Sequence, residues 1–288
     1  MFKLEESTVV ITGANSGIGF EIARTLAKKK ACVIFACKNQ FWGEYAVNKV
    51  KLDTGNTNIF YKNLDLSSID SIHNFSNNFN LDFENLNVLI NNPTIKCDSF
   101  SKTVDGFEMN MGVNHLGHFA LTGLLLEKIL KTPNSRIITI SSLFYRFGKI
   151  DFDNMNDKKN FKSNKAYNNS RLANMLFSLE LARKLKKHNI YTSSVSTHPG
   201  WTKISRNSNK FIRLFASIFG QSTELGALPT LHAVSLENVK NGDYFFPNKF
   251  GIYGKPQKKN ILETASNLKI SRQLWNLSED LTQIVYKF

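Results

Sequence analysis

Three glycines near the N-terminus have the spacing of a phosphate-binding loop. They are Gly13, Gly17 and Gly19, within the run Thr12-Gly13-Ala14-Asn15-Ser16-Gly17-Ile18-Gly19. The first allows a tight turn, the second lets the backbone approach a pyrophosphate, and the third lets a helix sit close to a strand. Free N–H groups at the start of that helix would face the anion. The run therefore predicts a site for a pyrophosphate.

The neighbouring residues supply the elements that such a loop needs. Residues 8–11 form a β-branched apolar run, which is typical of a buried strand. Residues 20–29 follow with apolar positions at helical spacing and with basic residues in the last turn. A strand, a glycine-rich turn and a helix in this order are the context that separates a dinucleotide loop from an ordinary glycine turn.

Tyr167 and Arg171 form a second group that is able to do chemistry. They are four positions apart, so their side chains share one face of a predicted helix, and Ser142 lies 25 positions before Tyr167. A tyrosine hydroxyl has an ordinary pKa of about 10, and a fixed cation nearby lowers it toward working pH. Such a phenol can give a proton to the alkoxide that forms when a hydride reaches a ketone, and a serine hydroxyl can hold the same oxygen.

The rest of the 288-residue chain alternates strands with helices, and no linker or repeat divides it. This pattern predicts one doubly wound α/β domain over residues 1–288, with a mostly parallel, seven-stranded sheet and helices on both faces. The last strand, at residues 242–247, is expected at the sheet edge. A long helix is expected within residues 103–130, another opening at Tyr167, and a C-terminal helix at about 268–286.

Composition narrows the function classes. The net charge is +14 and the pI is near 9.6, but the lysines are scattered and no nucleic-acid-binding motif accompanies them, so we expect no nucleic-acid partner. The odd cysteine count predicts a reduced, cytoplasmic protein, and we expect neither a signal peptide nor a membrane span. His115 and His118 lack a Glu or Cys that would complete a metal site, so we expect no metal.

Together these motifs resemble the short-chain dehydrogenase/reductase superfamily over about residues 5–255, and its retinol-dehydrogenase-like, ketone-reducing branch in particular. The resemblance rests on residues 12–19, Asn91-Asn92, residues 113–119, Tyr167 with its helix, and His198-Pro199-Gly200. It implies a Rossmann-type fold and an oxidoreductase that interconverts alcohols and carbonyls.

The resemblance also implies roles for single residues. Ser142 would orient the substrate, Tyr167 would be the acid/base and Asn114 would hold a relay water, while Arg171 occupies the family's lysine position. The residues that would contact the cofactor are Gly13, Asn15, Ser16, Gly17, Ile18, Gly19, Lys38, Asp65, Asn91, Tyr167, Arg171, Pro199, Gly200 and Thr202.

Two sites differ from the family pattern. Arg171 replaces a lysine, and Pro93-Thr94 replaces Ala-Gly beside the cofactor ribose. Arginine keeps the positive charge, but its forked, planar head must rebuild the ribose contacts, and it resists deprotonation. The alternatives are therefore an active enzyme and a catalytically weak, NADP-binding relative that acts through partners.

The strand at residues 31–37 bears on the choice of cofactor. No Asp or Glu occurs between Ala31 and Gln40, and Lys38 follows the strand, which favours NADP(H) over NAD(H). The alternative is an ordinary surface lysine. Asp65 would lie by the adenine, although an Asp that caps the next helix gives the same pattern.

The chain holds 23 phenylalanines, which suggests an apolar substrate of the retinoid, steroid or lipid type. Residues 200–222 are expected to form an insertion over the substrate. Within it, the basic, aromatic stretch 210–219 is interpreted either as a lid or as a helix at an anionic membrane surface. The two long helices after the fourth and fifth strands form dimer faces in relatives, so a homodimer is a further hypothesis.

Overall fold

The computed structural model describes residues 4–92, 95–156, 158–188, 190–200, 202, 221–258 and 267–288. Its elements in chain order are η1 (Leu4–Glu6), β1 (Thr8–Thr12), α1 (Gly17–Lys28), β2 (Cys32–Cys37), α2 (Gln40–Thr54), β3 (Ile59–Asn63), α3 (Ile69–Asp82), β4 (Val88–Asn91), α4 (Met109–Met111), η2 (Gly112–Leu116), α5 (Gly117–Lys131), β5 (Arg136–Ile140), η3 (Leu143–Phe147), α6 (Ser163–Lys187), β6 (Ser193–Thr197), α8 (Thr223–Ser235), β7 (Tyr244–Lys249), β8 (Tyr253–Lys258) and α10 (Leu268–Thr282).

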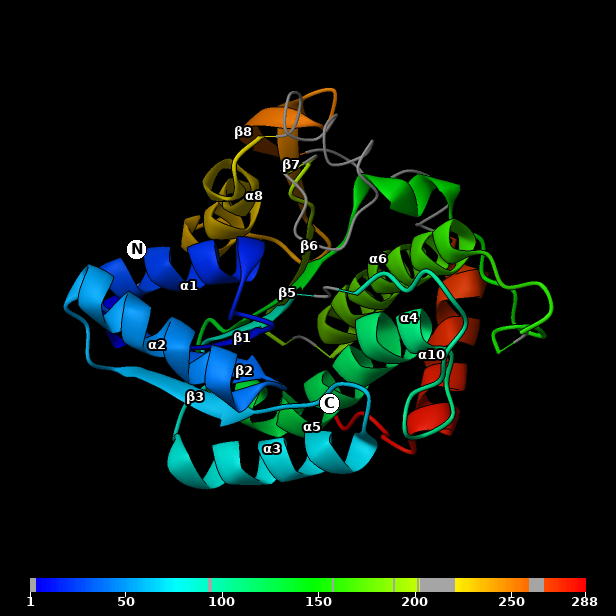
Figure 1. Ribbon diagram of the computed structural model, residues 1–288, viewed down its shortest axis with the longest axis horizontal. Helices are drawn as coiled ribbons and strands as arrows, with labels where there is room; N and C mark the ends of the chain where they lie inside the picture. Colours follow the sequence, from blue (N-terminus) through cyan, green and yellow to red (C-terminus); the bar gives the residue numbers. More distant parts are fainter. Residues whose placement is uncertain are drawn as a thin grey trace.

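A single sheet runs through the described part of the molecule (Figure 1), with the strand order β3-β2-β1-β4-β5-β6-β7-β8. Neighbouring strands from β3 to β7 are parallel, and β8 is antiparallel to β7. The strand order reverses between β1 and β4, and doubly wound folds bind ligands at the carboxyl ends of the strands at such a point. The predicted doubly wound, mostly parallel α/β fold is confirmed.

The predicted strand number is one too low, because β8 forms the edge that was assigned to residues 242–247. β7 turns through Phe250 and Gly251, both at positive φ, into β8. The sequence of β8, Tyr-Gly-Lys-Pro-Gln-Lys, has no apolar alternation, and none of its residues is fully buried. Edge strands tolerate glycine, proline and lysine because one side of the strand faces solvent. The strand therefore has no sequence signature.

Helices cover both faces of the sheet (Figure 1). α1, α2 and α8 pack on one face in a core that includes Ile22, Val47 and Val234. α3, α5 and α6 pack on the other, in a core that includes Phe79 and Leu125. Strands covered on both faces are apolar at almost every position, which is why the first, second and fourth strands could be predicted as short apolar runs.

The C-terminal helix α10 lies against α6, close to the predicted bounds. Its Trp275 stacks on Phe177 of α6, with ring centroids 5.9 Å apart, and meets Phe119 of α5 edge to face at 5.1 Å. Tyr286, beyond the helix, donates a hydrogen bond of 2.7 Å to the Phe119 carbonyl. The chain's own C-terminal segment thus covers part of the α5–α6 face.

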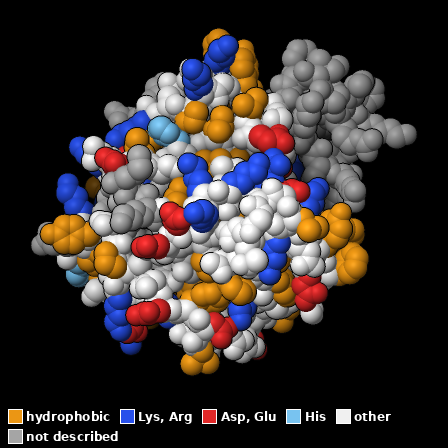
Figure 2. Space-filling view, turned by 90° about the vertical axis from the view of Figure 1, so that its left-hand side faces the viewer, with side chains coloured by type: hydrophobic (Ala, Val, Ile, Leu, Met, Phe, Trp, Pro, Cys, Tyr) orange, Lys and Arg blue, Asp and Glu red, His pale blue; other side chains and the backbone are white. Residues whose placement is uncertain are grey.

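The surface carries both signs of charge. Figure 2, which shows the side of the molecule on the left of Figure 1, has Lys and Arg side chains interspersed with Asp and Glu. Several lysines are paired: Lys30 lies 2.6 Å from Glu5, and Lys62 contacts Asp82. The expectation that the chain binds no nucleic acid stays a prediction.

Within the described ranges, no helix is long and apolar enough to cross a membrane. The same ranges contain no group of three or more His, Cys, Asp or Glu side chains that could hold a metal ion. Cys32, Cys37 and Cys97 are free thiols. The predicted insertion at 200–222, except for Gly200, Thr202, Gln221 and Ser222, lies outside the described residues, as does the stretch 210–219.

Candidate active site

The glycine-rich loop connects β1 to α1 with the conformations that its glycines permit. Gly13 has φ +60° and donates to the Ala36 carbonyl at 2.9 Å, while Gly17 has φ +58°. A Cβ on Gly19 would lie 2.7 Å from both the Gly13 oxygen and Asn92 Nδ2. The positive φ values require glycine at the first two positions, and close packing requires it at the third.

The start of α1 is open to a ligand. Ser16 is its N-cap residue in an extended conformation, and in the described part of the chain its side chain makes no capping hydrogen bond. Ser16 and Gly17 are exposed, and Asn15 and Ile18 are half-buried. An uncapped helix start behind an exposed glycine turn fits the diphosphate of a dinucleotide.

Lys38 and Asp65 form an ion pair beyond the end of β2, with 2.8 Å between Nζ and Oδ2. Asp65 Oδ1 also accepts from the backbone N–H and hydroxyl of Ser67. Partial burial alone would raise the pKa of the Asp65 carboxyl, but hydrogen bonds from Lys38 and Ser67 outweigh it and hold that pKa below its usual range. The N-cap of α3 is Ser68, so the interpretation of Asp65 as a helix cap is wrong.

The two asparagines after β4 fasten it to its neighbours. Asn91 is fully buried and donates from Nδ2 to Thr122 Oγ1 of α5 at 3.0 Å. Asn92 donates from its side chain to the Thr12 carbonyl at 3.0 Å and from its backbone to Thr12 Oγ1 at 2.8 Å. The side chain of Asn91 thus bonds to α5, while Asn92 holds the end of β1. Residues 93–94, where the sequence departs from the family pattern, lie outside the described residues.

Tyr167 and Arg171 share one face of α6, as their spacing predicts. The guanidinium carbon of Arg171 lies 4.5 Å from the centroid of the Tyr167 ring, in a cation–π arrangement. Arg171 is only 4% exposed, whereas Tyr167 is half-buried. The helix begins at Ser163, one turn before the predicted start at Tyr167.

Ser142 lies two residues beyond the end of β5, where it is the N-cap residue of η3. Its Oγ accepts a long hydrogen bond of 3.4 Å from the backbone of Phe144, whose ring meets Tyr167 at a centroid distance of 6.5 Å. The preceding Ser141 donates to the Arg171 carbonyl at 2.9 Å. The end of β5 is therefore fastened to α6, which brings Ser142 and Tyr167 to one place.

Asn114 lies in a π-helical turn, η2, between α4 and α5, where an uninterrupted helix was predicted. π-turns inside α-helices are frequent at functional sites. Asn114 is fully buried, and its side-chain amide donates to the Ile95 carbonyl at 2.9 Å and to Ser170 Oγ at 3.1 Å. Ser170 in turn donates to the Tyr167 carbonyl at 2.8 Å. The structure thus connects Asn114 to the turn of α6 that carries Tyr167.

The loop after β6 reaches the glycine-rich loop. Gly200 has φ +72°, and a Cβ on this residue would clash with the Ile252 carbonyl. A Cβ on Gly226 would meet the Thr202 methyl group and lie 3.6 Å from both Ile18 and Pro199. Pro199, Thr202 and Ile18 therefore gather around Gly226 of α8, close to the start of α1.

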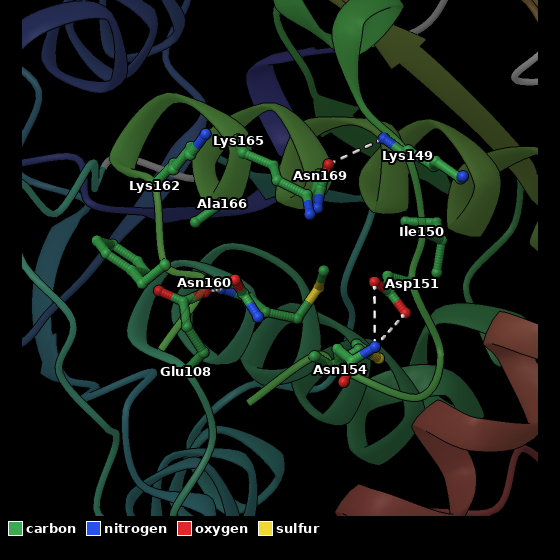
Figure 3. A pocket seen from close by; sticks show the side chains of 13 residues that line it. Glu108, Lys149, Ile150, Asp151, Asn154, Asn160, Lys162, Lys165, Ala166 and Asn169 are labelled. Atoms are coloured by element: carbon green, nitrogen blue, oxygen red, sulfur yellow. Dashed lines mark hydrogen bonds between the residues drawn. The ribbon is translucent and has the colours of Figure 1, made fainter. Parts of the chain in front are cut away.

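A cavity of about 280 Å³ lies beside the N-terminal half of α6 (Figure 3). Ala166 and Asn169 line it from α6, together with Ile150, Asp151 and Met111 from other segments. Neither Ser142 nor Tyr167 contributes to its lining, and helical spacing puts Ala166 and Asn169 on a different face of α6 from Tyr167. The cavity is therefore separate from the candidate active site.

Sequence reasoning missed the residues that join these parts. Ser141, Ser170 and His118 make the connecting hydrogen bonds, yet single serines and a core histidine carry no signature of such a role. The only indication in the sequence is that each of them lies near a predicted site residue. Ser141 adjoins Ser142, Ser170 adjoins Arg171, and His118 lies one helical turn after Asn114.

Comparison with known proteins shows the family of the chain. The family model described as short chain dehydrogenase matches residues 7–212. Retinol dehydrogenase 12 of Mus musculus is 39% identical over 292 residues, which cover 99% of this chain and 89% of that protein. Among solved structures, an uncharacterised protein from Mycobacterium paratuberculosis has a TM-score of 0.82 at 33% identity, and the match covers 98% of this chain and 95% of that one.

A Shigella flexneri short-chain dehydrogenase solved with NADP has a TM-score of 0.63 at 19% identity, with 85% of this chain and 98% of that one covered. At this identity the likeness concerns the fold alone. The family match and the near-full-length relatives go further, because they cover the glycine-rich loop, Ser142, Tyr167 and Arg171 together. The chain therefore belongs to the short-chain dehydrogenase/reductase family, close to its retinol-dehydrogenase-like branch, and is an oxidoreductase of alcohols and carbonyls.

Proposed function

We propose that the chain uses NADP(H) to interconvert a carbonyl group and an alcohol on an apolar substrate. The observation that carries the proposal is the cation–π pair of Tyr167 and Arg171 on α6, with Ser142 held beside it. Bound NADP(H) would supply or accept the hydride. The protein's own side chains would handle the proton and the substrate oxygen.

The proton would move at the Tyr167 hydroxyl. The Arg171 guanidinium over the ring would offset the negative charge that develops on the phenol oxygen during proton transfer, with the phenol as acid in one direction and as base in the other. Ser142 Oγ accepts from the Phe144 backbone, so its hydroxyl hydrogen can be donated to the substrate oxygen. Asn114, through Ser170, would keep the Tyr167 turn in position.

Lys38 supports the choice of NADP(H). Its side chain is 71% exposed at the end of β2, where a dinucleotide presents its adenosine ribose. An ammonium group has three donors, so Lys38 can bond Asp65 and still meet a 2′-phosphate. The fold itself accommodates this cofactor in the Shigella flexneri protein solved with NADP.

Exposed aromatic rings support an apolar substrate. Phe144 is 48% exposed beside Tyr167, and Phe147, 6.5 Å from Phe144, is 71% exposed. Large apolar side chains left in solvent next to reactive groups are typical of a ligand-binding surface. The name of the mouse relative, a retinol dehydrogenase, points to the retinoid class.

A second candidate function is cofactor binding without efficient turnover. It is favoured by the burial of Arg171, whose planar head lies on the Tyr167 ring in the family's lysine position. A guanidinium stays charged and cannot pass a proton on, whereas an ammonium can. The protein would then act through partners, with a bound dinucleotide as a structural ligand.

The experiment is a comparison of NADPH and NADH, first for binding and then for oxidation with a panel of retinoid, steroid and aliphatic aldehydes and ketones. The proposal expects tighter binding of NADPH and turnover with the apolar compounds. Tyr167→Phe is the matched control, because it removes only the hydroxyl. Binding of NADPH with no turnover of any compound would favour the second function.

We also propose a cytoplasmic location. The free thiols of Cys32, Cys37 and Cys97 suit a reducing compartment. Peripheral membrane contact through the basic, aromatic stretch 210–219 is a separate hypothesis, and it is tested by deleting that stretch. Fractionation of cells that express the full chain, with and without that deletion, would show whether the protein sediments with membranes.

A further inference from the structure

His118 lies between the cofactor-binding and catalytic parts of the candidate site. Its Nε2 is 2.8 Å from Thr12 Oγ1 at the end of β1, and its Nδ1 is 3.0 Å from the carbonyl oxygen of Asn114 in η2. His118 is 1% exposed, and Thr12 and Asn114 are fully buried. Its side chain therefore bonds to both of these segments at once.

The partners define one tautomer of His118. A carbonyl oxygen only accepts, so Nδ1 carries the proton and donates to Asn114. Nε2 must then accept from the Thr12 hydroxyl. Burial, together with the nearby charge of Arg171, lowers the pKa of His118 to about 4, so the ring is neutral near neutral pH. Both hydrogen bonds have a fixed direction.

On the cofactor side, the chain of hydrogen bonds reaches the glycine-rich loop. Thr12 Oγ1 accepts from the Asn92 backbone, and the Asn92 side chain donates to the Thr12 carbonyl. Gly13, the first glycine of the loop, follows Thr12 directly, and Gly19 packs on Asn92. A shift of Thr12 would therefore move the residues that shape the diphosphate site.

On the catalytic side, the chain of hydrogen bonds reaches Tyr167. The backbone carbonyl of Asn114 accepts from His118. The side-chain amide of Asn114 donates to the Ile95 carbonyl and to Ser170 Oγ. Ser170 donates to the Tyr167 carbonyl. A series of hydrogen bonds, buried as far as Ser170, thus runs from Asn92 and Thr12 through His118 and Asn114 to the helical turn of Tyr167.

We propose that His118 is a positioning residue that couples the glycine-rich loop to the helical turn carrying Tyr167. Through it, ordering of the loop by the diphosphate of a dinucleotide would also order Asn114 and Tyr167. The kinetic consequence rests on the proposed function, whereas the mechanical coupling does not. The test therefore measures the coupling itself as well as turnover.

Three substitutions separate the two hydrogen bonds. His118→Phe keeps the ring and removes both. The amide of His118→Asn can replace Nδ1 toward Asn114, and the longer His118→Gln can replace Nε2 toward Thr12. His115→Phe is the matched control, because His115 is also 1% exposed on the same helical segment but bonds Ser278 of α10.

The experiment is amide hydrogen exchange of the full-length protein, followed at residues 12–19 and 163–171, with NADPH binding and kinetics on the same samples. We expect His118→Phe to raise exchange about tenfold in both segments and to raise the NADPH dissociation constant by a similar factor. His118→Asn and His118→Gln should each protect only the segment whose bond they keep. His115→Phe should leave both segments as in the parent.

Equal exchange in His118→Phe and the parent would overturn the proposal, and so would the same rise in His115→Phe. If His118→Phe does not fold, identical exchange patterns in the Asn and Gln variants would overturn it instead. If the unsubstituted protein shows no turnover of any compound, the proposed function is contradicted. The exchange result still decides whether His118 couples the two segments. In an active enzyme, His118→Phe should lower kcat as well as raise KM for NADPH, which a purely structural lesion at His115 would not do.

Discussion

The guanidinium carbon of Arg171 lies 4.5 Å from the centroid of the Tyr167 ring, one helical turn away on α6. The positive charge therefore acts on the phenol through the face of its ring. Arg171 is 4% exposed, so water screens this charge poorly. The arrangement gives the candidate acid/base a fixed cation although the family's lysine is absent.

Removing this charge should impair proton transfer more than cofactor binding. We expect Arg171→Met to lower kcat by about 100-fold and to change the NADPH dissociation constant much less, because the cation over the Tyr167 ring is lost while the glycine-rich loop is untouched. Arg183→Met, on the same helix but ion-paired with Glu180, is the control. Steady-state kinetics and NADPH titration of both variants check this prediction, and an equal loss of kcat in Arg171→Met and Arg183→Met would contradict it.

Lys38 should control the choice between NADPH and NADH. We expect Lys38→Ala to raise KM for NADPH about tenfold and to leave KM for NADH unchanged, because only NADPH carries a 2′-phosphate. Lys62→Ala removes another ion-paired lysine, on β3, and should change neither value. Asp65→Asn should lower KM for NADPH, since Lys38 loses its competing carboxylate. If the ratio of the two KM values is unchanged in Lys38→Ala, Lys38 is an ordinary surface lysine that does not bind the 2′-phosphate.

Gly19 should tolerate a methyl group less well than Gly17. A Cβ on Gly19 would be 2.7 Å from two polar atoms, whereas on Gly17 it would meet no atom of the described residues within 4 Å. Within the protein itself, Gly17→Ala meets only the strain of its positive φ, of order 1–3 kcal/mol. We expect Gly19→Ala to lose dinucleotide binding and to lower Tm further than Gly17→Ala. Calorimetry and dinucleotide titration of both variants would check the order.

Acid should unfold the protein through its buried histidines. Burial lowers the pKa of His115 to about 3 and those of His118 and His198 to about 4, well below the ordinary value for histidine. Between about pH 6.5 and pH 4, the unfolded chain therefore binds more protons at these histidines than the folded chain does. The free energy of unfolding is highest above about pH 6.5 and falls as the pH falls toward 4. Each histidine contributes a slope of up to about 1.4 kcal/mol per pH unit in that window. Urea unfolding at pH 7, 6 and 5 should show the loss, and His115→Phe should make it shallower.

The C-terminal helix should be essential for stability. Trp275 is 2% exposed and packs between α5 and α6, so Trp275→Ala should cost about 3–5 kcal/mol. Removal of residues 268–288 should expose Phe119 and Phe177 and cause self-association, which light scattering would detect. A truncated protein that stays monomeric with an unchanged Tm would contradict this role. In the intact chain, a homodimer formed through α5 and α6 would have to accommodate α10.

The fold could be predicted because its strongest signals are local. Strands buried on both faces are apolar runs, and the glycines of residues 13–19 are required by their own backbone angles and close contacts. The shared face of Tyr167 and Arg171 follows from the 3.6-residue helical period. These features needed no knowledge of distant contacts.

The features that could not be predicted depend on contacts distant in sequence or on weak local preferences. The start of α6 was missed because Lys162 at its N-cap is not a capping residue. The π-turn at Asn114 differs from α-helix by hydrogen-bond register alone, which composition does not reveal. His118 and Thr12 are 106 positions apart, so only the folded chain shows that they bond.

The role of Tyr167 as acid/base is tested most directly by NADPH absorbance with an apolar aldehyde, for the unsubstituted protein, Tyr167→Phe and Arg171→Lys. We expect the unsubstituted protein to oxidise NADPH, and Tyr167→Phe to lose at least about 100-fold in kcat while it still binds the dinucleotide. The contradicting result is a parent protein that binds NADPH but turns nothing over until Arg171→Lys restores the lysine.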